Sequence, residues 1–221
     1  MSGKHLPTCL GPPCGCNNQK LWILFWISTT TSSLEYYLGI PSGSSSVQAD
    51  AMHALVHSLW YGSPLWINIW ARARRFSGDQ EAHLIKKWMP LNRLFLFVSL
   101  GKVAYEALKK FWYFTPIASD FFMLVGGLVG LLGGFLQLQV LNKIKQTDAV
   151  LENKRYQSFR IDTLGDVWIS VVVVAMAASL SIIKGTQLES YSTALNVFDP
   201  VFTLLVVIVI GHMGYRLFRS S

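Results

Sequence analysis

The sequence predicts an all-α integral membrane protein with six transmembrane helices and both termini on the cytoplasmic side. Hydrophobic residues make up 52% of the chain and charged residues 14%, whereas a soluble domain carries about 25% charged residues. The hydrophobic residues also form long blocks of about 20 residues, which is the length that a helix needs to cross a bilayer. We therefore expect a lipid bilayer to surround most of the chain.

Six apolar blocks define the expected organisation. The predicted spans cover residues 21–40, 44–70, 91–112, 119–141, 157–183 and 191–217. Together they predict one six-helix transmembrane domain over 21–217, with an amino tail at 1–20, a carboxyl tail at 218–221 and no C-terminal soluble domain. The proline-containing start lacks the charged segment and clean apolar core of a cleavable signal peptide.

Individual spans carry their own signals. The second half of the first span, STTTSSLEYY, is too polar to face lipid, so it should face other helices or a water-filled cavity. Pro41 and Gly43 predict a tight turn before the second span. The fourth span contains many glycines, and small residues at spacings of three and four allow neighbouring helices to approach closely.

Basic residues are distributed unevenly between the two sides of the predicted bundle. The amino tail, the loops at 72–93 and 143–160 and the carboxyl tail carry most of them, while the opposite loops hold only Lys109, Lys110 and Lys184. The positive-inside rule makes the basic side cytoplasmic. We expect a multi-pass protein, in a bacterial inner membrane. This distribution explains the net charge of +7 without a nucleic-acid partner.

Two pairs of ionisable residues lie within the predicted spans, and each pair is spaced by four positions. His53 and His57 are in the second span, and Asp162 and Asp166 are in the fifth. This spacing places each pair on one helix face, about one turn apart. A mid-membrane carboxylate costs about 2.5–3.5 kcal/mol on insertion scales, so two on one face favour a bound counter-charge.

A divalent metal ion satisfies both the ligand number and the charge of these residues. Two imidazoles and two carboxylates suit tetrahedral Zn²⁺, and the two carboxylates neutralise its charge, which matters where solvation is poor. The imidazoles disfavour Mg²⁺ and Ca²⁺. Cobalt, nickel, iron and cadmium remain alternatives to zinc.

Other interpretations apply to these and nearby polar residues. A buried histidine often makes an interhelical hydrogen bond, and Asp162 could pair with Arg160 instead of a metal. Asp50 either fixes a histidine tautomer beside the metal or makes an interhelical hydrogen bond. Asp199, which precedes a proline, is interpreted as structural.

Candidate peripheral metal ligands lie outside the spans. His83 falls in the predicted basic loop, where a solvated histidine is the simpler interpretation. The amino tail contributes further zinc-binding side chains, but without the spacing of a zinc motif. These are His5, Cys9, Cys14 and Cys16.

At these residues the sequence resembles the cation diffusion facilitator family of metal transporters. SGSSSVQADAMHALVH is similar to that family's second-span signature and FRIDTLGDVWIS to its fifth-span signature. FDPVFT resembles the sixth-span Asp-Pro motif, YEALKKF resembles the end of the third span, and Glu35 falls where the family often has a first-span glutamate.

The resemblance implies a divalent-metal transporter whose site comprises His53, His57, Asp162 and Asp166. It also implies proton-coupled export from the cytoplasm and a homodimer. The chain departs from the family pattern at His57, where aspartate is usual, and at Asp162, where histidine is usual. The two departures preserve two imidazoles and two carboxylates, so zinc stays the first choice while metal selectivity is open.

Three other functions are weighed against transport. An intramembrane zinc protease needs a glutamate directly after its first histidine, and Ala54 stands there instead, so we expect no enzyme. A haem carrier needs an axial partner histidine on another span. A metal-gated channel needs a continuous polar pore rather than a closed four-ligand site.

Overall fold

The regular structure of the chain is helical throughout the part that the structure describes. The computed structural model describes residues 18–74, 78–113, 116–143, 154–184 and 190–219. The helices in these ranges are α1 (Asn18–Ser42), α2 (Ser45–Arg74), α3 (Gly78–Tyr113), α4 (Asp120–Asn142), α6 (Lys154–Lys184) and α7 (Ser190–Arg219). The predicted all-α class is therefore confirmed for these ranges.

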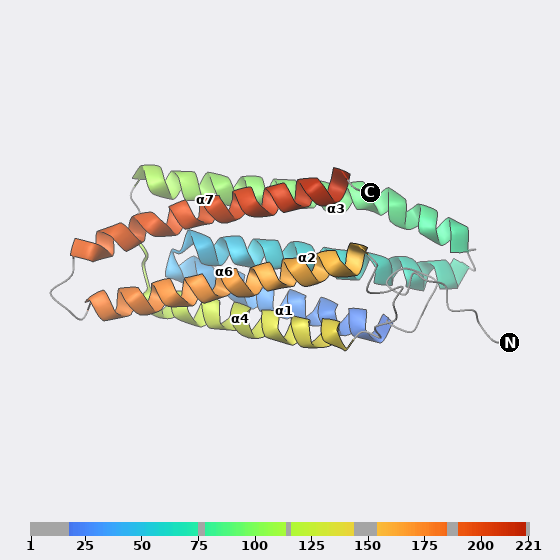
Figure 1. Cartoon of the computed structure of the whole chain (residues 1–221), viewed down its shortest axis with the longest axis horizontal. Coiled ribbons are helices and arrows are strands. Elements are labelled where there is room, and N and C mark those ends of the chain that lie inside the picture. Colours follow the sequence, from blue (N-terminus) through green and yellow to red (C-terminus); the bar gives the residue numbers. More distant parts are fainter. Residues whose placement is uncertain (1–17, 75–77, 114–115, 144–153, 185–189, 220–221) are drawn as a thin grey trace.

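The helices form an elongated bundle with α2 at its centre. They run along one common axis with alternating directions, so that α1 begins and α7 ends toward the same end (Figure 1). Helix α1 packs most extensively against α2 and α4, α4 packs against α6, and α3 packs against α2 and α7. Helix α2 thus connects a group formed by α1, α4 and α6 to the pair formed by α3 and α7.

A left-handed glycine makes the turn between α1 and α2. Gly43 has a φ of +64°, a conformation that costs little only for glycine. Its backbone N–H donates to the carbonyl of Ile40 at 3.2 Å. The turn predicted from Pro41 and Gly43 is present, and it places the start of α2 directly beside the end of α1.

Glycines on α4 permit close helix packing, as predicted. A Cβ at Gly133 would lie 2.5 Å from the side chain of Thr31 on α1, and one at Gly127 would lie 2.9 Å from Val174 on α6. Neither position has room for a larger side chain. Ser119 caps the start of α4: its hydroxyl accepts a hydrogen bond from the backbone N–H of Phe122, which is the usual N-cap arrangement.

The polar half of α1 turns its polar side chains into the bundle or back onto its own backbone. Ser28, Ser32 and Glu35 are buried. The hydroxyls of Thr29 and Ser33 donate to carbonyls one turn earlier on the same helix, which is how such residues are commonly satisfied within helices. One face of STTTSSLEYY therefore faces other helices as expected, whereas Thr30, Ser33, Leu34, Tyr36 and Tyr37 are exposed on the outside of the bundle.

Two segments of the described chain have the length and hydropathy of a membrane span by composition alone, Asp120–Asn142 and Thr163–Lys184. A further apolar stretch of the described residues, Asn196–His212 in α7, is shorter than these two. Large hydrophobic side chains nevertheless lie exposed on the outside of the bundle, among them Trp26, Trp112 and Ile182.

The predicted loop at 72–93 is wrong throughout its described part, and the predicted loop at 143–160 is wrong over 154–160, while 144–153 lies outside the described residues. Helix α2 continues to Arg74 and α3 already begins at Gly78, while α6 begins at Lys154. Arginine and lysine are good helix formers, so helices continue through these basic segments. The basic residues indicate one end of the bundle, but they do not indicate where the helices end.

Two apolar clusters lie on either side of a polar layer along α2. Val47 belongs to a buried cluster with residues of α4 and α6, including Met123 and Val173. Tyr61 and Leu65 belong to a second cluster with residues of α1 and α4. Along α2, the predicted ligands His53 and His57 lie in the sequence between the residues of these two clusters.

Candidate metal centre

Three of the four predicted ligands meet between α2 and α6. One Asp166 oxygen lies 3.3 Å from Nε2 of His53, and the other lies 3.1 Å from Nδ1 of His57. The two imidazole rings have centroids 4.5 Å apart. We call His53, His57 and Asp166 the histidine–aspartate cluster.

The spacing in the sequence and the packing of two helices produce this cluster. His53 and His57 are one turn apart on α2 and therefore project from one face, and that face packs against α6. The side chains of His53, His57 and Asp166 are 3%, 2% and 9% exposed. The cluster is therefore enclosed within the bundle.

The geometry suits a small metal ion. One ligand atom from each of the three residues lies within 4.8 Å of the other two. Nitrogen and oxygen ligands that surround zinc at about 2.0–2.2 Å in a tetrahedron lie about 3.4 Å from one another. The separations of 3.1 and 3.3 Å between Asp166 and the imidazoles are already close to this value.

The fourth predicted ligand belongs to the same helix as Asp166. Asp162 lies in α6, one turn before Asp166, but its side chain lies outside the described residues. Its role as a ligand stays a prediction. Its neighbour Arg160 is exposed.

Asp50 makes the interhelical hydrogen bond that was one of its two expected roles. The Ser170 hydroxyl of α6 donates to its carboxylate at 2.8 Å. The alternative role, fixing a histidine tautomer, stays a prediction. Ser170 lies four residues after Asp166, so it occupies the next turn of the same face of α6.

Of the predicted peripheral ligands, His83 is described, and it is not part of the cluster. His83 is exposed on α3, within a helix rather than the loop that was predicted for it. The tail residues lie outside the described part of the chain, namely His5, Cys9, Cys14 and Cys16.

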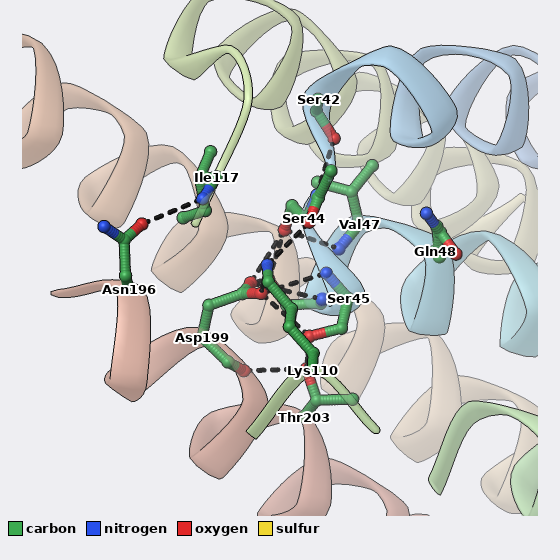
Figure 2. Close-up of polar contacts among 12 residues, drawn as sticks. Ser42, Ser44, Ser45, Val47, Gln48, Lys110, Ile117, Asn196, Asp199 and Thr203 are labelled. Carbon is green, nitrogen blue, oxygen red and sulfur yellow. Dashed lines mark hydrogen bonds and ion pairs between the residues drawn. The ribbon is translucent and has the colours of Figure 1, made fainter. Parts of the chain in front are cut away.

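Asp199 of α7 is at the centre of a second buried polar group, at the start of α2 (Figure 2). Its carboxylate accepts hydrogen bonds from the backbone N–H groups of Ser45 and Ser46 at 2.9 and 3.3 Å. It also accepts from the hydroxyls of Ser44, Ser45 and Ser46. A carboxylate at this position satisfies the free N–H groups of α2 and interacts favourably with the helix dipole.

Lys110 completes this group, which we call the Asp199 network: Ser44, Ser45, Ser46, Lys110, Asp199 and Thr203. Lys110 is buried on α3, where its ammonium lies 2.7 Å from the Asp199 carboxylate and donates to the carbonyl of Gly43 at 2.6 Å. The loop predicted for Lys110 is wrong, because this residue lies in the last turn of α3. An aspartate within a predicted span is the signal that could have pointed to a buried cationic partner. The structural interpretation of Asp199 agrees with these contacts.

The comparison with known families identifies the chain. A family model described as the cation efflux transmembrane domain matches residues 90–221. The chain belongs to the cation efflux family. The matched segment contains Asp162, Asp166 and Asp199 but begins after His53 and His57.

Membership fixes the general activity of the chain. Proteins of the cation efflux family are membrane transporters of divalent metal cations rather than enzymes. The resemblance found in the sequence to the cation diffusion facilitators is therefore confirmed. The buried histidine–aspartate cluster is the group of side chains in the described structure that suits such an ion.

Proposed function

We propose that this cation efflux protein exports zinc from the cytoplasm in exchange for protons, with His53, His57, Asp162 and Asp166 as the transport site. The observation that carries the proposal is the meeting of two histidines and Asp166 inside the bundle. Cobalt, nickel, iron and cadmium suit a similar set of ligands, so they are the alternative substrates.

The ligand set explains how an ion can enter a poorly solvated site. The aspartates neutralise Zn²⁺, which removes most of the cost of bringing its charge into the bundle. The imidazoles take part of its coordination shell in place of water. Neutral histidines supply this ligation without further charge.

Proton exchange follows from the same histidines. Metal binding requires unprotonated imidazoles, and an imidazole outside a protein has a pKa of about 6.5. Zinc therefore competes with protons near neutral pH. We propose alternating access, in which zinc loads from the cytoplasm and protons from the opposite side displace it.

The proposed topology has six membrane-crossing helices with both termini in the cytoplasm, in a bacterial inner membrane, and the transporter is a homodimer. The common axis of the helices and the exposed tryptophans on the outside of the bundle support the crossings (Figure 1). The basic residues at the end of α2 and in the first half of α3, such as Arg74 and Lys87, support the orientation.

Zinc uptake into proteoliposomes with a trapped zinc dye tests the proposal. Asp166→Ala should lower the zinc flux by at least about 100-fold, because it removes a ligand and a neutralising charge. Asp120→Ala is the matched control, since Asp120 pairs with Lys184 at the end of the bundle. Wild-type protein that carries none of zinc, cobalt, nickel, iron or cadmium would refute the transport site.

The pH dependence tests the coupling. Zinc affinity should be highest above pH 7 and should fall as the pH decreases through about 6.5, by up to about 100-fold per pH unit if both imidazoles must lose a proton. Dye-competition titrations between pH 5.5 and 8 measure this slope. Zinc flux that is unaffected by collapse of the proton gradient would contradict exchange.

A further inference from the structure

A second group of buried oxygen atoms lies beside the histidine–aspartate cluster. Asp50 precedes His53 by three residues on α2, and Ser170 follows Asp166 by four residues on α6. Because α2 and α6 run in opposite directions (Figure 1), both residues are displaced toward the end of the bundle that carries the α1–α2 turn. We call Glu35, Asp50 and Ser170 the Glu35 cluster.

Gly130 of α4 makes room for this cluster. A Cβ at Gly130 would overlap the carboxylate oxygen Oε1 of Glu35, and it would lie 2.7 Å from the hydroxyl of Ser170. The oxygens of Glu35 and Ser170 therefore share the space over this glycine. Ser170 is hydrogen-bonded in turn to Asp50, so residues from α1, α2 and α6 meet at one point over α4.

The Glu35 carboxylate lacks the partners that a buried acid needs. Glu35 is 2% exposed, and within the described ranges the structure gives its carboxylate no hydrogen bond. Its charged neighbours are Asp50 and Asp166, and both would repel it. A buried carboxylate without a donor or a counter-charge is strongly unfavourable, so this side chain is satisfied by a proton or by a ligand of positive charge.

We propose that Glu35, Asp50 and Ser170 form a second, weaker divalent-cation site that receives the transported ion after it leaves the histidine–aspartate cluster. The inference rests on the proposed function for the direction of movement. Two carboxylates neutralise one divalent ion, and the serine hydroxyl and water complete an all-oxygen shell. Zinc binds such a shell less tightly than one with imidazoles, and an ion in transit must bind weakly enough to leave.

Equilibrium binding of radioactive zinc to the purified full-length protein tests this site. The measurement uses a background with Cys9, Cys14 and Cys16 replaced by serine, so that the amino tail does not contribute thiol ligands. This background should bind zinc in a tight and a weak class. Glu35→Gln should remove the weakly bound zinc ion, one per chain, and keep the tightly bound one. Asp166→Ala should remove the tightly bound ion and keep the weakly bound one.

Two glycines supply a test that leaves every carboxylate in place. Gly130→Ala puts a methyl group into the proposed site and should also remove the weak class. Gly101→Ala is the matched control, because a Cβ there meets nothing within 4 Å, and it should bind zinc like the background. Glu106→Gln, on α3, is the control for charge removal. A sharp gel-filtration peak for each variant establishes that it is folded.

Transport separates this inference from the proposed function. Glu35→Gln should lower the maximal zinc flux several-fold with little change in KM, because loading is intact and release is slowed. Glu35→Asp should restore part of the rate. Weak-class binding that is unchanged in Glu35→Gln would overturn the inference, even if the variant alters the pH dependence of transport. Loss of flux in Asp166→Ala would still support the transport site in that case.

Discussion

Asp199 and Glu35 are both buried acids in the same bundle, yet their surroundings differ completely. Asp199 accepts hydrogen bonds from three serine hydroxyls and two backbone N–H groups and pairs with Lys110. Within the described chain, Glu35 has no hydrogen bond and lies near two other acids. The first arrangement fixes three helices together. The second leaves a buried acid that a proton or a cation can neutralise, which is what exchange of a transported cation for protons requires.

The largest expected effect on stability is at Asp199. Asp199→Ala should destabilise the protein by about 3–5 kcal/mol, because Lys110 would remain buried without a partner. Asp120→Ala, which breaks the exposed pair with Lys184, should cost only about 0.2–1 kcal/mol. Thermal unfolding in detergent compares the two. Equal losses would show that the Asp199 network is not a structural centre.

The histidine–aspartate cluster should contribute to the stability of the protein mainly when zinc is bound. Zinc at 100 times its Kd should stabilise the wild-type protein by about 2.7 kcal/mol, and Asp166→Ala should abolish this gain. Without zinc, Asp166→Ala should unfold close to the wild-type temperature, since the substitution removes a buried charge. Thermal unfolding with zinc or a chelator measures both values. A zinc shift retained in Asp166→Ala would place the bound ion elsewhere.

The sequence predicted those features that depend on spacing along a single helix. His53 and His57 share a face because they are four residues apart, and the α4 glycines mark close packing because a Cβ has no room there. The helical class, the α1–α2 turn and the burial of Glu35 follow from equally local signals.

The sequence did not predict features that depend on pairing between helices. Lys110 is adjacent to Lys109 in the sequence, and only the packing of α3 against α2 and α7 reveals that one of them is buried beside Asp199. The sharing of space by Glu35 and Ser170 over Gly130 likewise needs three helices in place. Helix boundaries in the basic segments failed because charge indicates membrane side and not backbone conformation.

The smallest expected effect concerns the glycines that bring α4 against α1. Gly133→Ala should cost about 1–3 kcal/mol, because its Cβ would lie 2.5 Å from Thr31 and neither backbone can move without opening the bundle. Gly101→Ala has open space and should be neutral, or stabilising by up to about 1 kcal/mol through helix propensity. Thermal unfolding of both variants isolates the packing contribution. Equal effects of the two substitutions on thermal unfolding would show that the close approach of α4 to α1 does not stabilise the bundle interior in which Glu35 and Asp166 lie.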